Sequence, residues 1–175
     1  MGDPESVARG ICLRALTGAP KTRQQLADLL AQRGVPDDAA ETVLDRFTEV
    51  GLIDDAAYAR AWVSSRQAGR GLARRALSAE LRAKGVDPEV AAEAVEAVDD
   101  EDEREAARRL VERRVGGMRR LDRPTATRRL IGMLARKGYG GGLAAAVVRE
   151  ALDSAQHGVE DPDGLDDLGG ADLAL

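Results

Sequence analysis

Residues 81–86 read LRAKGV, and two similar stretches occur in the chain, LAQRGV at 30–35 and LARKGY at 134–139. In each case another leucine lies four residues before the first letter, which places the two leucines on one face of a helix. A basic residue, a glycine and an apolar residue then follow. Glycine just past the last turn takes the left-handed conformation that closes a helix, and a basic residue there complements the helix dipole. The repeated stretch therefore predicts three helices that end at Gly34, Gly85 and Gly138, 51 and 53 residues apart.

Apolar residues recur again after each glycine, at positions 5, 9, 10 and 13 beyond it. This pattern predicts a second amphipathic helix in each copy. The starts of the helices are also marked, because Asp87-Pro88-Glu89 is typical of a capped helix start and Thr22 to Gln25 of a capping box. The recurring residues are Ala39, Val43, Leu44 and Phe47; Val90, Ala94, Val95 and Val98; and Leu143, Val147, Val148 and Ala151.

A third helix is expected before each pair, through VARGICLRAL, DDAAYARAWVSSR and EDEREAARRLVERR. The expected buried faces are Tyr58, Ala61, Trp62 and Ser65 in the second of these helices and Ala107, Leu110 and Val111 in the third. The fold class predicted is all-α, an elongated, curved tandem array of three three-helix repeats. The expected units are 1–52, 53–99 and 100–152, followed by a disordered acidic tail at 153–175. Because each unit has few large side chains, neighbouring units are expected to stack and share their cores.

Composition argues against several classes of protein. Aromatic residues make up only 2% of the chain, and no stretch approaches the roughly 18 apolar residues of a membrane span. The N-terminal stretch lacks the pattern of an export signal, so a cytoplasmic protein without membrane association is expected. Cys12 is the only cysteine and His157, in the expected tail, the only histidine. Nucleophile–histidine pairs and cysteine metal clusters are therefore not predicted. A phosphate-binding loop is not predicted either, because no glycine run follows an expected strand and no G-x-x-x-x-G-K-[ST] motif is present. The expectation is a binding protein with no catalytic residue, cofactor or metal.

Charge is distributed unevenly along the chain. The net charge is −4 over residues 1–56, +7 over 57–149 and −8 over 150–175, which gives the total of −5. Segment 104–137 holds 12 Arg and Lys residues against three acids. Such segregation indicates a polyanionic or acidic partner for the middle of the chain.

The basic residues of the middle predict a partner-binding surface, called here the arginine strip. Arginine suits carboxylates and phosphates because its planar group makes two charge-assisted hydrogen bonds at once. Arg114 falls on the expected buried face of its helix and is left out. The alternative is a solvated helical surface with no binding role. The strip comprises Arg60, Arg66, Arg70, Arg74, Arg75, Arg104, Arg108, Arg109, Arg113, Arg119, Arg120, Arg123, Arg128, Arg129, Arg136 and Lys137.

Two other functions are compatible with the pattern. The first unit, with two helices joined near Gly34-Val35-Pro36, is similar to a helix-turn-helix DNA-binding domain. A winged version would need a hairpin next, where the sequence predicts a helix. A passive helical scaffold that binds partners without changing their activity is the other alternative.

The stretch GLIDDAAYARAWVSSRQAGRG at 51–71, followed by LRAKGV and LARKGY, resembles the RecX family of bacterial recombination regulators. The resemblance covers roughly residues 8–152 and implies a tandem array of three-helix units. It also implies binding in the groove of the RecA filament and inhibition of RecA ATP hydrolysis, strand exchange and co-protease activity. The expected partners are that filament and, through the arginine strip, single- or double-stranded DNA, with the protein acting as a monomer. The residues that carry the match are expected to be structural; they are Gly51, Leu52, Ile53, Asp54, Asp55, Tyr58 and Ala59.

Overall fold

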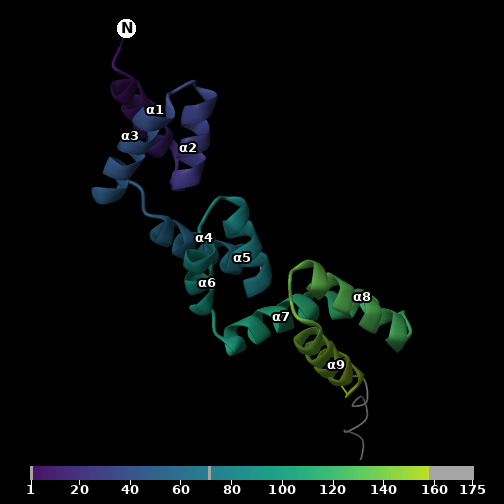
Figure 1. The fold of residues 1–175 in the computed structure, drawn as a ribbon. Coiled ribbons are helices and arrows are strands. Elements are labelled where there is room, and N and C mark those ends of the chain that lie inside the picture. Colours follow the sequence, from purple (N-terminus) through teal and green to yellow (C-terminus); the bar gives the residue numbers. More distant parts are fainter. Residues whose placement is uncertain (1, 71, 158–175) are drawn as a thin grey trace, which may run out of the picture.

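The three predicted leucine–glycine endings close α2, α5 and α8 in a computed structural model, which describes residues 2–70 and 72–157. Within those ranges the chain forms α-helices and one 3-10 turn and no strand. Figure 1 shows three helical bundles following one another in an elongated, curved array. The all-α tandem fold is therefore confirmed. The elements are α1 (Pro4–Gly18), α2 (Arg23–Gln32), α3 (Asp37–Glu49), α4 (Asp55–Arg70), α5 (Arg74–Ala83), α6 (Pro88–Glu96), α7 (Asp100–Val115), η1 (Gly116–Met118), α8 (Arg123–Arg136) and α9 (Gly141–His157).

The leucine pairs and the glycines behave as the sequence predicts. All six leucines are fully buried at 0% exposure, and they are Leu26, Leu30, Leu77, Leu81, Leu130 and Leu134. The closing glycines have positive φ angles of 73° at Gly34, 84° at Gly85 and 91° at Gly138. In each case the residue after the glycine donates its backbone N–H to the carbonyl of the second leucine, and its apolar side chain is buried. The repeated stretch is thus one helix-closing motif used three times.

Each unit has its own hydrophobic core, which corrects the expectation that neighbouring units share theirs. Three separate clusters of buried residues lie in α1–α3, in α4–α6 and in α7–α9. Two residues cross the expected bounds: Ile53, just before α4, belongs to the cluster of the first unit, and Ala73, just before α5, belongs to the cluster of the third. The units are therefore small bundles joined at narrow contacts.

Two other expectations are wrong in detail. The buried face of α4 is formed by Ala59 and Val63, with Tyr58 and Trp62 partly buried beside it, while Ala61 and Ser65 are exposed. The predicted face is therefore displaced by one residue along the helix. Helix α9 continues past the expected tail boundary at 153 and ends at His157. The remainder of the predicted tail, 158–175, lies outside the described residues. None of the described helices is long and apolar enough to cross a bilayer.

The joint between units is built the same way twice. At the first joint the Thr22 hydroxyl donates to the Lys84 carbonyl at 2.7 Å, and the Arg23 N–H donates to the Asp55 carboxylate at 3.0 Å. The start of α2 therefore contacts both the end of α5 and the start of α4. Thr22 also forms the predicted capping box with Gln25.

The second joint repeats this arrangement one unit later. The Ala73 N–H donates to the Lys137 carbonyl at 3.1 Å, and the Arg74 N–H donates to the Glu103 carboxylate at 3.3 Å. The start of α5 thus contacts the end of α8 and the first helix of the third unit. The joints set how the units lie along the array and hence where the basic residues of units two and three meet.

Candidate anion-binding surface

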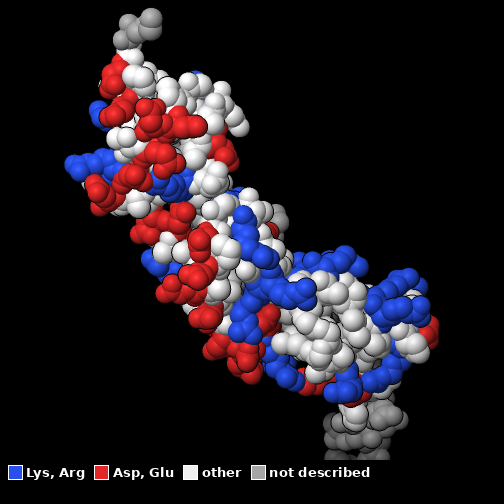
Figure 2. Space-filling model, in the orientation of Figure 1, with Lys and Arg blue, Asp and Glu red and all other residues white. Residues whose placement is uncertain are grey.

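Basic side chains gather around the third unit and its joint with the second, as Figure 2 shows, while acidic side chains follow the opposite edge of the first two units. This separation in space follows the separation of charge along the chain. The arginine strip is not one uniform surface, however, because the structure divides its members by their partners.

One group of strip arginines makes internal ion pairs, so the excess of 12 basic residues over three acids in segment 104–137 overstates the number of unpaired arginines. The acids come from other helices or from one turn away on the same helix, and several lie outside the segment whose charges suggested a free basic surface. The pairs are Arg66–Glu80 at 3.5 Å, Arg74–Glu103 at 2.8 Å, Arg74–Asp100, Arg104–Glu150, Arg108–Glu105 at 2.7 Å, Arg108–Glu150 at 3.9 Å, Arg109–Glu105 at 3.6 Å and Arg123–Asp153 at 2.5 Å.

The environment of Trp62 shows what such an arginine does in the fold. The guanidinium carbon of Arg66 and the ammonium nitrogen of Lys84 each lie 4.3 Å from the centre of the Trp62 ring. The Trp62 indole N–H donates to the Glu80 carboxylate at 2.8 Å, and that carboxylate also pairs with Arg66. Arg66 therefore links α4 to α5, and its main role is structural.

A second group of strip arginines makes no ion pair or side-chain hydrogen bond with other described residues, and all of its members are exposed. Arg128 lies near enough to Asp122 to contribute to lowering the pKa of that carboxyl, after the larger effect of hydrogen bonds from Thr125. The side chain of Arg70 lies outside the described residues. The group comprises Arg60, Arg75, Arg113, Arg119, Arg120, Arg128, Arg129 and Arg136.

Part of this second group converges with other residues on one cavity, called here the third-unit groove. Its volume is about 650 Å³, and its lining comes from the end of α7, the turn after it, α8 and the segment before α5. Cationic groups stand beside apolar ones, so the groove can hold an anionic chain that also carries apolar surface. The lining residues are Leu72, Arg114, Met118, Arg128, Arg129, Leu130, Gly132, Met133, Arg136 and Lys137.

Arg114 is a candidate site residue that helical periodicity did not identify. Helical periodicity placed it on the buried face of α7, yet it is exposed and lines the third-unit groove. The reason is its position in the last turn, one residue before α7 ends at Val115 and the chain turns through Gly116–Met118. A basic residue in a last turn complements the helix dipole, and that signal could have identified it.

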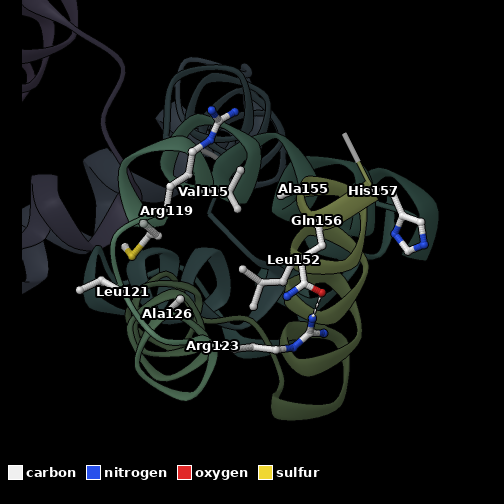
Figure 3. A pocket seen from close by; sticks show the side chains of 10 residues that line it. Val115, Arg119, Leu121, Arg123, Ala126, Leu152, Ala155, Gln156 and His157 are labelled. Atoms are coloured by element: carbon white, nitrogen blue, oxygen red, sulfur yellow. Dashed lines mark hydrogen bonds between the residues drawn. The ribbon is translucent and has the colours of Figure 1, made fainter. Parts of the chain in front are cut away.

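A larger cavity of about 980 Å³, called here the α9 pocket, lies on the other side of Met118, which lines both. Figure 3 shows its wall of α9 side chains facing Val115, Leu121 and the start of α8. The floor is mainly apolar, and the two basic side chains at its edge are Arg119 and Arg123. Arg123 donates to Gln156 at 2.9 Å and pairs with Asp153, whereas Arg119 makes no such contact with the described residues.

The other side chains that could carry chemistry lie in structural surroundings. Within the described residues no three His, Cys, Asp or Glu side chains are grouped to hold a metal ion. Cys12 is buried, and burial raises the pKa of its thiol. The acidic side chains at the helix starts act as caps, since Asp54 accepts from the N–H of Ala57 and Asp99 from that of Asp102. What remains is a cationic surface that can bind phosphates or carboxylates.

Comparisons with known proteins agree with this architecture. Three family sequence models match in order: the first three-helix domain of RecX at residues 8–47, the second at 54–95 and the third at 100–148. The regulatory protein RecX of Streptomyces lividans is 59% identical over 151 residues, which cover 86% of this chain and 80% of that protein. The regulatory protein RecX of Thermobifida fusca is 55% identical over 153 residues, 87% and 82% of the two chains.

Solved structures show the same fold. The crystal structure of RecX from Lactobacillus salivarius superposes with a TM-score of 0.81 at 19% identity, covering 86% of this chain and 98% of that one. A second crystal structure, of a regulatory protein RecX, gives a TM-score of 0.75 at 21% identity and covers 86% of this chain and 72% of that one. At this level of identity the likeness concerns the arrangement of helices.

Proposed function

The chain belongs to the RecX family of regulatory proteins, and on that premise we propose that it binds the RecA–DNA filament and inhibits RecA ATP hydrolysis, strand exchange and co-protease activity. In this proposal the protein acts in the cytoplasm as a monomer and catalyses no reaction. Its role then belongs to homologous recombination, DNA repair and the SOS response.

The third-unit groove is the observation that carries the proposal. It brings Arg114, Arg128, Arg129 and Arg136 together with Lys137 beside apolar side chains. Arginine binds phosphate and carboxylate groups through paired, charge-assisted hydrogen bonds, so the groove suits an acidic protein surface or a nucleic acid backbone. The strip arginines with internal ion pairs are less available, because a partner would first have to displace their carboxylates.

The shape of the array supports a polymeric partner. A curved series of three bundles, each with its own core, presents contacts over a length that one globular bundle could not span. A binder that contacts several subunits changes an activity only if it binds one state of the filament more tightly than another. Inhibition would then come from that difference in affinity.

The helix-turn-helix alternative loses support at α3, which would be the recognition helix of the first unit. Its exposed face carries Asp37, Asp38, Glu41, Asp45 and Glu49 and one arginine. A recognition helix lies in the major groove between phosphate chains, where this face would be repelled. The residues after α3 form α4, where a winged domain would need a hairpin.

The test is a titration of the protein into RecA on single-stranded DNA with ATP turnover as the readout. We compare the wild type with the variant Arg128→Glu/Arg129→Glu/Arg136→Glu in the third-unit groove. The control variant, Arg9→Glu/Arg14→Glu/Arg33→Glu, makes the same change of charge at exposed residues of the first unit. Helical circular dichroism establishes that both variants are folded.

The wild type and the control should inhibit similarly, whereas the groove variant should need at least about tenfold more protein, a loss of about 1.4 kcal/mol. Equal losses in both variants would mean that only overall charge matters. An unaffected groove variant would remove this surface from the binding site. Lack of inhibition by the wild type would contradict the proposed function itself.

The salt dependence of binding separates two kinds of contact. The affinity for DNA falls with salt concentration, and each phosphate that the protein neutralises makes this fall steeper by close to one power of the salt concentration. If the groove binds the DNA backbone, the groove variant should show a shallower salt slope than the wild type. An unchanged slope with weaker inhibition would assign the groove to RecA carboxylates.

A further inference from the structure

The α9 pocket lies beside the C-terminal end of α9, the last helix that the structure describes. Four residues of its lining belong to the end of α9, and they are Leu152, Ala155, Gln156 and His157. We propose that the acidic segment 158–175 of this chain binds back into the α9 pocket and across Met118 into the third-unit groove. Bound there, it would compete with a polyanionic partner. Binding of the segment is independent of the proposed function, and only the competition rests on it.

The segment is long enough to reach both cavities. His157 lines the pocket and is the last described residue, so segment 158–175 is attached directly beside the pocket. The 18 residues from 158 to 175 could span at most about 60 Å when extended. Because Met118 lines both cavities, the segment can pass from the α9 pocket to the third-unit groove without crossing unrelated surface.

The chemistry of the two cavities selects a peptide over a bare phosphate chain. The α9 pocket has an apolar floor that includes Val115, Leu121 and Leu152, which a nucleic acid backbone could not fill favourably. Its arginine without an ion pair among the described residues is Arg119, and the adjoining groove adds further arginines. Such a surface fits a segment in which apolar side chains stand between carboxylates.

Segment 158–175 has that composition. It carries six acidic residues and no lysine or arginine. Leu165 and Leu168 flank Asp166 and Asp167, so leucines can enter the apolar floor while the carboxylates meet arginines. Segment 104–137, which supplies most of the lining, has the opposite excess of charge, 12 basic residues against three acids.

Tethering makes even a weak contact effective. A segment attached directly beside its site has an effective concentration in the millimolar range, whereas a second copy of the chain must reach it by diffusion. The intramolecular arrangement is therefore favoured over exchange between copies, and it should not depend on protein concentration.

The experiment uses the full chain and two variants of the segment. The first neutralises its acids, Glu160→Gln, Asp161→Asn, Asp163→Asn, Asp166→Asn, Asp167→Asn and Asp172→Asn. The second, Leu165→Ser/Leu168→Ser, leaves the net charge at −5 and so separates docking from overall charge. Methyl NMR spectra report on the pocket through Val115, Met118, Leu121 and Leu152, with Leu26 and Leu30 of the first unit as internal controls.

Both variants should shift the pocket methyl signals and leave those of Leu26 and Leu30 in place, independently of protein concentration. Unchanged pocket signals in both variants would overturn the proposal. Shifts that appear only at high protein concentration would overturn it as well, since the occupant would then be a second copy. This readout needs no partner, so it stands even if the RecA titration fails.

The competition is measured with a 30-residue oligo-dT strand at low salt by fluorescence anisotropy. Release of a tethered segment should tighten binding by about three- to tenfold in both variants. Tighter binding of the acid-neutralised variant alone would show a general charge effect and overturn the competition. If pocket signals shift while all three proteins bind oligo-dT equally, docking is supported and competition is refuted.

Discussion

Replacing Gly85 by alanine should separate the first two units at their joint. A Cβ atom built there would lie 2.3 Å from the Gln24 Cβ and 2.6 Å from its Cγ. Carbon atoms in contact prefer about 3.5–4.0 Å. The Gln24 Cβ cannot rotate away because it is bonded to the backbone of α2. Gly85→Ala therefore requires the start of α2 and the end of α5 to separate.

Gly34 provides the matched control, because it closes the equivalent helix with φ +73° but has open space around it. Alanine at either position adds about 1 kcal/mol for the left-handed backbone. Gly85→Ala also loses the Thr22–Lys84 and Arg23–Asp55 hydrogen bonds, about 1 kcal/mol each. The expected loss of stability is thus about 3 kcal/mol at Gly85 and about 1 kcal/mol at Gly34.

The assay is urea unfolding followed by Trp62 fluorescence. Trp62 is the only tryptophan, it belongs to the second unit, and the Lys84 side chain at the first joint lies over its ring. Small-angle X-ray scattering supplies the shape. The scattering profile should change for Gly85→Ala and remain that of the wild type for Gly34→Ala.

If the two variants differ in stability by less than about 0.5 kcal/mol and scatter alike, the close approach at Gly85 is not a structural requirement. The reasoning about the joint would then be refuted. Gly138→Ala tests the second joint in the same way, because its Cβ would lie 2.8 Å from the Ala76 Cβ. It should lose a similar amount of stability to Gly85→Ala.

Three further predictions concern the joints and the third core. Thr22→Val should lose about 1–2 kcal/mol of stability in urea unfolding, since it removes a helix cap and the bond to Lys84, whereas Thr22→Ser should lose little. Arg74→Ala should lower the free energy of unfolding in urea by about 1 kcal/mol, because it removes the ion pair with Glu103 at the second joint. Arg75→Ala, at the exposed neighbouring residue, should leave the free energy of unfolding nearly unchanged. Burial raises the pKa of Tyr139 to about 12. The folded state then keeps a proton that the unfolded state releases above about pH 10, so stability should fall as pH rises from 10 to 12. Tyr139→Phe should remove that part of the decline, and an identical decline in the variant would refute the assignment.

Much of the fold was predictable because it depends on local signals. Leucine pairs at helical spacing and glycine endings specify the same helix wherever they occur, and the burial of Leu77 and Leu81 follows from them. The separate cores were not predictable in this way. Whether Ala73 packs on its own unit or on the next depends on how two units meet, and periodicity within one helix contains no information about that.

The sequence predicts which basic residues could form the candidate site, but not which of them are paired with acidic residues in the fold. Sequence position shows that Arg104 is basic, but Glu150, which pairs with it, is 46 residues away on α9. Ion pairs between helices distant in sequence cannot be read from local charge counts. Arg114 was missed for another reason: helical periodicity predicts which face of α7 points inward, but not whether the rest of the fold still covers that face in the last turn, and Arg114 is exposed there.

The joints also explain why the three repeats are not equivalent. Twelve positions before each closing glycine stand Thr22, Ala73 and Ala126, and all three are buried. In the first two units this residue lies just before its helix, against the end of the equivalent helix of the next unit. Helix α8 instead begins at Arg123, so Ala126 lies within the helix.

The added first turn of α8 changes what this end of the third unit can bind. Arg123 in that turn pairs with Asp153 and donates to Gln156, both on α9. The backbone N–H at Ala126 is already bonded to the Asp122 carbonyl, whereas the equivalent N–H at Ala73 is donated to the neighbouring unit. The third unit therefore does not offer the joint used twice before. Shortening α8 by this turn should free the backbone N–H of Ala126 to form such a joint with another copy of the chain. If the two observed joints depend mainly on where the helix starts, the variant should self-associate, and light scattering would detect this. A variant that stays the size of the wild type would show that the joints depend on the surrounding units instead.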